Sequence, residues 1–300
     1  MEIPLLDAQR MAQDPDGFAT DLGRAARGSG FFLLENHGVS ADLIAQVLAQ
    51  GDAFFALPEA EKARIAIDAG NRGWAWEGSE KLDPESGQVD RKEAFNMGLN
   101  LAADDPRILA GEPFRGVNRW PDLPGFAETL RQYFEAVHGL GQRVMQAVAR
   151  DLGLPPGHFE KSFDAPMATL RLLSYPAGSA TDGIGAGAHT DYGALTFLLT
   201  DGVPGLQVQP RGQSDWIDVP DVPGAYIINI GDCLMRWSND TYVSTPHRVL
   251  PPPRQRRSIA FFLDPNPEAE VACLPGLGEA KYAPISGAEY LRSRLEATYG

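Results

Sequence analysis

The sequence predicts an α+β fold in which helices surround a β-barrel or β-sandwich, and two observations support this class. In the first half of the chain, apolar residues recur every three or four positions, which is the period of an amphipathic helix. In the second half, short apolar runs alternate with Gly, Pro, Asp and Asn, as in short strands joined by turns. A chain of 300 residues that is 43% hydrophobic can bury a large core.

The first half is expected to be mainly helical. Residues 17–27 are predicted to form a short helix, residues 31–34 an apolar strand, and Ser40 is placed to cap a helix that runs through Phe54. The longest predicted helix follows Pro124. Its apolar stripe advances in steps of three and four, through Phe126, Leu130, Phe134, Val137, Leu140, Val144 and Val148.

The second half is expected to form the barrel. Ser286 and Glu289 have the spacing of a capping box and predict a terminal helix. We therefore expect residues 1–160 to form a mainly helical N-terminal region and residues 161–300 to form a β-structured core with a C-terminal helix, together one functional unit. The predicted strands are 170–175, 195–199, 206–208, 216–219, 225–230, 247–250 and 258–263.

Composition excludes several classes of function. The chain has 26 basic and 40 acidic residues and a net charge of −14, so nucleic acid and anionic lipid are not expected partners. No apolar run reaches membrane-spanning length, and the N-terminus lacks the pattern of a signal peptide. Two cysteines, Cys233 and Cys273, suggest a reducing, cytoplasmic location. The oligomeric state stays open.

A candidate metal site begins with His189 and Asp191. Two residues apart on a strand, they would face the same way. A second imidazole would complete the 2-His-1-carboxylate triad that binds iron(II) and leaves three positions open. His–x–acid pairs arise easily by chance, so the assignment depends on the third ligand. His247, at the start of a predicted strand, is the candidate.

The strand after His247 carries a possible carboxylate grip. Arg256 and Ser258 lie two residues apart and would share a face. A guanidinium fork beside a hydroxyl binds a carboxylate with charge-assisted hydrogen bonds.

These motifs resemble the isopenicillin N synthase-like family of iron(II)/2-oxoglutarate oxygenases. The similar stretches span roughly residues 30 to 265 and identify the family while saying little about the substrate. They are 30–38 (GFFLLENHG), 91–95 (RKEAF), 173–176 (LSYP), 189–193 (HTDYG), 231–232 (GD), 244–248 (STPHR) and 256–258 (RRS).

The resemblance implies a distorted double-stranded β-helix, a jelly-roll barrel wrapped by helices. It also implies that His189, Asp191 and His247 bind iron(II), and that Arg256 and Ser258, with Tyr175 nearby, bind 2-oxoglutarate. A family member of this kind uses dioxygen to hydroxylate a small molecule and releases succinate and carbon dioxide. Two alternatives remain: an oxidase of the same fold that cyclises, desaturates or forms ethylene, and a non-catalytic ligand-binding homologue.

Four further residues are candidates for contact with the substrate. Trp74, Trp76 and Phe95 lie in a region that often lines substrate pockets in the family, although packing is an equally good role for each. Arg171 lies four residues before Tyr175 on the same predicted strand, so it is expected to face inward as well, provided no β-bulge intervenes. Its partner would be an acidic substrate or a buried Asp or Glu of the protein.

Overall fold

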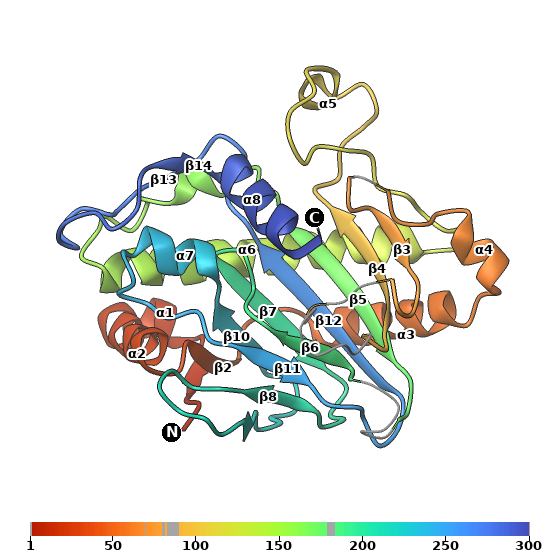
Figure 1. Cartoon of the computed structure of the whole chain (residues 1–300), viewed down its shortest axis with the longest axis horizontal. Helices are drawn as coiled ribbons and strands as arrows, with labels where there is room; N and C mark the ends of the chain where they lie inside the picture. The colour runs from red at the N-terminus through yellow and green to blue at the C-terminus, as the bar shows by residue number, and fades with distance from the viewer. Residues whose placement is uncertain (1, 69, 80–81, 83–89, 179–183, 300) are drawn as a thin grey trace.

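Two β-sheets form the centre of the computed structural model, which describes residues 2–68, 70–79, 82, 90–178 and 184–299 (Figure 1). The large sheet has eight strands in the order β1-β2-β10-β7-β12-β5-β4-β3, and the small sheet has four in the order β6-β11-β8-β9. The strands of the large sheet are β1 (Leu5–Asp7), β2 (Phe31–Glu35), β3 (Gly73–Ala75), β4 (Glu93–Gly98), β5 (Thr169–Tyr175), β7 (Leu195–Thr200), β10 (Tyr226–Ile230) and β12 (Arg256–Leu263).

The small sheet faces the inner side of the large one. Its strands are β6 (Ala186–His189), β8 (Leu206–Val208), β9 (Ile217–Asp218) and β11 (His247–Val249). A short ribbon of β13 (Glu270–Val271) and β14 (Ile285–Ser286) lies apart from both sheets in the pairing. Side chains from the two sheets pack in one apolar cluster, which includes Leu173 and Ala260 from the large sheet and Leu206 and Val249 from the small one. The architecture is the expected distorted double-stranded β-helix.

The helices of the described residues are α1 (Arg10–Gln13), α2 (Pro15–Gly28), α3 (Ala41–Phe55), α4 (Glu59–Ala63), α5 (Pro106–Leu109), α6 (Phe126–Asp151), α7 (Asp232–Trp237) and α8 (Gly287–Tyr299), with a 3₁₀ turn at Glu160–Ser162. Of these, α2, α3 and α6 pack on strands of the large sheet, whereas α8 borders the cavity. The long helix α6 runs behind the sheet (Figure 1) and packs on β12, where the rings of Phe134 and Phe261 meet edge to face at 5.1 Å. No helix of the described chain is long and apolar enough to cross a membrane.

The predicted helix starts are confirmed by their capping bonds. The Ser40 hydroxyl accepts a hydrogen bond from the backbone N–H of Leu43 at 3.4 Å, at the start of α3. At the start of α8, the Ser286 hydroxyl accepts from the N–H of Glu289, and the Glu289 carboxylate accepts from the N–H of Ser286, both at 3.2 Å. Every residue of the apolar stripe predicted for α6 is buried.

Two strand predictions need correction. β1, β3 and β4 were not expected; β1 and β3 are the two edge strands of the large sheet, so the mainly helical N-terminal region supplies both of its edges. β4 is buried on both faces, so its sequence lacks the alternation that marks a half-buried strand. The strand of the metal site is shorter than expected: β6 ends at His189, and Asp191 lies in the loop that follows.

Candidate active site

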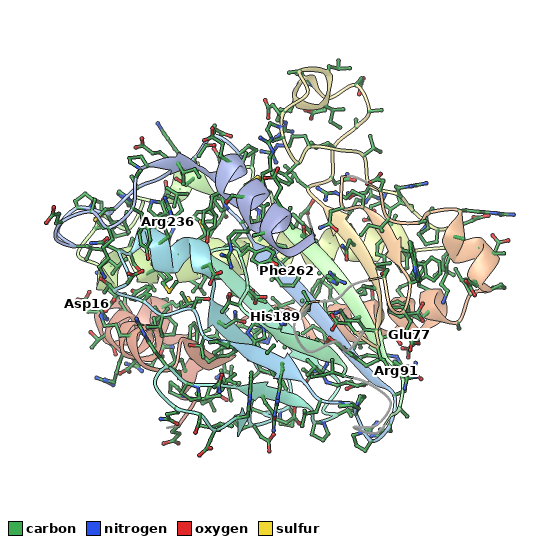
Figure 2. The ribbon with its side chains drawn as sticks, in the orientation of Figure 1. Asp16, Glu77, Arg91, His189, Arg236 and Phe262 are labelled. Carbon is green, nitrogen blue, oxygen red and sulfur yellow. The ribbon has the colours of Figure 1, made fainter. Side chains whose placement is uncertain are left out.

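A cavity of about 710 Å³ opens between the two sheets. It is lined by side chains from the inner faces of β5 and β12, by the end of β6 with the loop that follows, and by side chains of α8. Figure 2 shows His189 and Phe262, both of which line the cavity, near the centre of the molecule.

The three predicted metal ligands meet in this cavity. The ligand atoms of His189, Asp191 and His247 all lie within 4.8 Å of one another. Asp191 Oδ1 is 3.8 Å from His189 Nε2 and 3.7 Å from His247 Nε2. β6 and β11 pair directly at the two histidines, which sets the imidazoles side by side with ring centroids 4.3 Å apart. These spacings suit a single ion bound between the three side chains.

Backbone carbonyls orient both imidazoles. His189 Nδ1 lies 2.7 Å from the Gly187 carbonyl oxygen, and His247 Nδ1 lies 3.2 Å from the Thr245 carbonyl oxygen. A carbonyl oxygen can only accept, so each Nδ1 carries the proton and each Nε2 keeps its lone pair for a metal. Burial, followed by the neighbouring His247, lowers the pKa of His189 to about 4, which keeps this ring neutral at physiological pH.

The carboxylate of Asp191 is held on its other side. Its Oδ2 accepts hydrogen bonds from the hydroxyl of Thr196 at 2.6 Å and from the amide of Asn229 at 2.8 Å. Burial alone would raise the pKa of Asp191, but the two imidazoles and these two hydrogen bonds reverse that effect and lower it. Oδ1 therefore points toward the imidazoles as an ionised ligand. The donor set and its support fit iron(II).

Arg256, Ser258 and Tyr175 lie together on the inner faces of β12 and β5, and Tyr175 lines the cavity. Arg256 pairs with Tyr175 across β12 and β5, and its guanidinium carbon is 5.0 Å from the centre of the Tyr175 ring. Arg256 is 1% exposed; its Nε donates to the Val203 carbonyl oxygen at 3.1 Å, and Nη1 reaches the Ser258 hydroxyl at 3.5 Å. None of the described acidic residues forms an ion pair with it. A buried guanidinium of this kind is suited to a carboxylate that arrives from outside the protein.

Arg171 also faces the cavity. Thr169, Arg171, Leu173 and Tyr175 all line it, as alternate residues of one strand face should. The pairing of β5 with β12 runs without a shift from Thr169 to Tyr175, so no bulge interrupts the shared face.

The three aromatic candidates lie elsewhere, so the expectation that they line the cavity is wrong. Phe95 and Trp74 pair across β4 and β3 and face the outer side of the sheet, where Phe95 packs against Phe54 and Phe126. Trp74 is 5% exposed and donates its indole N–H to Glu93 at 2.9 Å. Trp76 lies outside the cavity and is 48% exposed. Strand alternation decides the positions of Trp74 and Phe95, and β3 and β4 were not predicted.

Several cavity residues were not singled out from the sequence. Thr196 and Asn229, which hold Asp191, come from β7 and β10, 5 and 38 residues away from Asp191 in sequence. Asp264 directly follows β12, and its position six residues after Ser258 would have placed it on the same face. The helix α8 contributes Leu291, Leu295 and Glu296, for which the sequence held no signal beyond the helix itself.

Two imidazoles and one carboxylate inside a double-stranded β-helix define the class of mononuclear non-haem iron oxygenases. Comparison with known proteins agrees. Residues 3–123 match the model of the non-haem dioxygenase N-terminal region in morphine synthesis, and residues 166–265 match the 2OG-Fe(II) oxygenase superfamily. The chain is 36% identical to the 2-oxoglutarate-Fe(II) type oxidoreductase hxnY of Emericella nidulans, over 91% of this chain and 82% of that one. The chain belongs to the 2OG-Fe(II) oxygenase superfamily.

Solved structures show the same relationship. A full-length protein of Neurospora crassa, solved in complex with alpha-KG and thymine, has a TM-score of 0.87 and 32% identity, covering 99% of this chain and 97% of that one. A 2OG-Fe(II) oxygenase family protein from Caulobacter crescentus has a TM-score of 0.89 and 31% identity, with 98% of each chain covered. The protein is thus a 2-oxoglutarate-dependent dioxygenase that requires iron(II), 2-oxoglutarate and dioxygen.

Proposed function

We propose that this dioxygenase hydroxylates a small polar molecule, with an acidic group on the substrate as the partner of Arg171. The observation that carries the proposal is that Arg171 lines the same cavity as the metal-binding triad, separately from the buried Arg256. Arg256 lies beside Tyr175, and Arg171 lies four residues from Tyr175 on the same strand face. Two carboxylate-binding groups suit two different ligands.

The first of these ligands is 2-oxoglutarate. Arg256 and Ser258 would hold its distal carboxylate, with the Tyr175 ring covering the guanidinium. His189, Asp191 and His247 would hold the iron, which with 2-oxoglutarate and dioxygen supplies the oxidising power for attack on a C–H bond. The burial of these groups excludes bulk water from the reacting atoms, and the hydrogen bonds to Asp191 and both imidazoles keep the ligand geometry fixed.

The second ligand would bind nearer the mouth of the cavity. Arg171 offers a fork of donors to a carboxylate or another electron-rich oxygen. The Neurospora crassa relative, 32% identical, was solved with thymine, a planar molecule with two carbonyl oxygens. A small organic acid or an oxygen-rich heterocycle therefore fits the chemistry of this end.

The test is a screen of small organic acids and heterocycles for stimulated succinate release by protein loaded anaerobically with iron(II) and then exposed to oxygen. We expect a compound that raises succinate release and gains one oxygen atom in equal amounts. A compound that is oxidised without succinate formation would instead support an oxidase of the same fold. The His247→Ala protein, assayed in parallel, should release no succinate with any compound.

A further inference from the structure

Asp264 is a buried acid that the metal site and the 2-oxoglutarate site do not use. It follows the last residue of β12, and by strand alternation it continues the series of Ala260 and Phe262, which also line the cavity. It lines the cavity and is 7% exposed. Its carboxyl group therefore faces the space in which a substrate would lie.

No described residue donates a hydrogen bond to this carboxyl group, and no described Lys or Arg forms an ion pair with it. The loop after the metal ligand Asp191 packs closely on it instead: a Cβ on Gly193 would lie 3.0 Å from Asp264 Oδ1. The titratable groups that act on it most are acidic, Asp191 from this loop and Cys233 from α7. Burial, with a smaller effect of Asp191, raises the pKa of Asp264 to about 7.

Water in the open cavity can satisfy a carboxyl group of this kind, but a substrate that fills the cavity displaces that water. The substrate must then offer a hydrogen-bond donor of its own, because a carboxyl group left without a partner in a dry site lowers affinity. Asp264 would thus discriminate between ligands by the hydrogen-bonding group that they present to it, in addition to the group that binds Arg171.

We propose that Asp264 is a specificity-determining residue that binds the N–H of a lactam or imide edge on the substrate. This inference rests on the proposed function, since it assigns the substrate class of the same cavity. An N–H beside a carbonyl is complementary to a carboxyl group in both of its forms. The ionised form accepts from the N–H, and the neutral form also donates to the adjacent carbonyl oxygen.

The position of Asp264 relative to Arg171 agrees with a ligand of one ring. Arg171 pairs with Ala260, four residues before Asp264, so the two positions are about 13 Å apart along the strand at the usual rise per residue. Both side chains project from the same face into the cavity. A small heterocycle with an oxygen or carboxylate toward Arg171 and a lactam edge toward Asp264 would meet both.

The test measures binding without turnover, by calorimetry in the absence of oxygen, on protein loaded with iron(II) and 2-oxoglutarate. The probes are thymine with 1,3-dimethylthymine, and 6-oxo-1,6-dihydropyridine-3-carboxylate with its N-methyl form. In each pair the methylated compound keeps the ring and the carbonyl oxygens but loses the N–H. We expect at least one unmethylated probe to bind about tenfold or more tightly than its methylated partner, the usual effect of removing one partner of a buried hydrogen bond.

Two variants separate recognition from structure. Asp264→Asn keeps a donor and an acceptor, so it should preserve the preference for the N–H compound; Asp264→Leu removes both, so it should abolish that preference. Equal binding of the two members of both pairs, or a preference that survives in Asp264→Leu, would overturn the inference. The binding assay needs no hydroxylation. Wild-type protein that hydroxylates none of the probes would therefore count against the proposed function, whereas the role of Asp264 would still be decided by the binding results.

Discussion

The two ends of the cavity are built in different ways. At the end that we propose for 2-oxoglutarate, neighbouring strands place Arg256, Ser258 and Tyr175 by their register, and all three are almost completely buried. At the substrate end, the walls come from loops and from the terminal helix, including Phe114, Leu291 and Leu295. A shift in strand register moves every side chain to the other face and is poorly tolerated, whereas loops and chain ends tolerate substitutions and insertions. The proposed co-substrate contacts thus depend on strand register alone, whereas the lining of the proposed substrate end also depends on loops and the terminal helix.

The side chains at the two ends also differ in how they are held. Arg256 has Val203 and Ser258 as fixed partners, and the metal ligand Asp191 has Thr196 and Asn229. Asp264, at the substrate end, has no hydrogen-bond donor among the described residues. If this contrast is correct, substitutions at the first end should affect every reaction of the enzyme, and substitutions at the second should affect one ligand at a time.

The largest effect is expected from His247→Ala. Two remaining ligands cannot hold the facial geometry, so both bound iron and succinate formation should be lost. Iron content after anaerobic loading and succinate release would be measured together. His158→Ala, the same change at an exposed histidine, is the control and should leave both unchanged. Full activity in His247→Ala would refute the ligand assignment.

Arg256→Lys should weaken 2-oxoglutarate selectively. Lysine keeps the charge but loses the planar fork, so we expect the KM for 2-oxoglutarate to rise at least about tenfold, a loss on the order of 1.5–3 kcal/mol. Iron content should stay unchanged. Arg254→Lys, two residues earlier and exposed, controls for the substitution itself. An unchanged KM for 2-oxoglutarate would place the co-substrate elsewhere in the cavity.

Arg171→Gln should act only on the substrate end. We expect the KM for an acidic substrate to rise by about tenfold, since the loss of one charged hydrogen bond is worth roughly 1.5–3 kcal/mol before solvent compensates part of it. The KM for 2-oxoglutarate and the iron content should not change, and Arg171→Lys should recover part of the affinity. If the variant loses stability while its kinetic constants stay the same, Arg171 has a structural role.

The difference between the ends also explains what the sequence could predict. The ligands His189 and His247 and the pair Arg256 and Ser258 lie in short local motifs, and the continuous register of β5 placed Arg171 inward as expected. At such positions, strand parity and the chemistry of the residue are enough to predict that the side chain belongs to the site. Asp191 was assigned correctly to the triad, although β6 ends at His189 and does not extend to Asp191 as expected.

The substrate end was predicted poorly for a physical reason. Trp74 and Phe95 were candidates because their region often lines substrate pockets in the family, but parity along β3 and β4 turns both toward the core. These strands are short or buried on both faces, so their sequences carry no alternation that would reveal which side faces the cavity. The contribution of α8 depends on where the terminal helix docks, and that follows from long-range contacts rather than from local pattern.

The smallest expected effect comes from weakening the contact between α8 and the metal-binding loop, which tests the difference between the two ends of the cavity. Arg294 on this helix donates to Asp232 at 2.7 Å, and the same carboxylate oxygen accepts from the hydroxyl of Thr190 at 2.9 Å. The backbone N–H of Asp232 in turn donates to the carbonyl oxygen of Asp191 at 2.7 Å. The terminal helix is therefore linked to the metal-binding loop by a short chain of hydrogen bonds, and it lies beside the end of β12 (Figure 1).

Arg294→Gln removes the charge from this link. The arginine side chain is 38% exposed, so the ion pair is expected to contribute only about 0.2–1 kcal/mol. With the link weakened, α8 should spend more time away from the rim of the cavity, and kcat/KM for the substrate should fall by roughly two- to fivefold. The KM for 2-oxoglutarate should stay constant, because Arg256 and Ser258 do not depend on α8. Arg292→Gln, on the exposed side of the same helix, should change neither constant. An equal loss at both ends of the cavity in Arg294→Gln would show that α8 supports the whole barrel, and the distinction between a rigid and an adaptable end would fail.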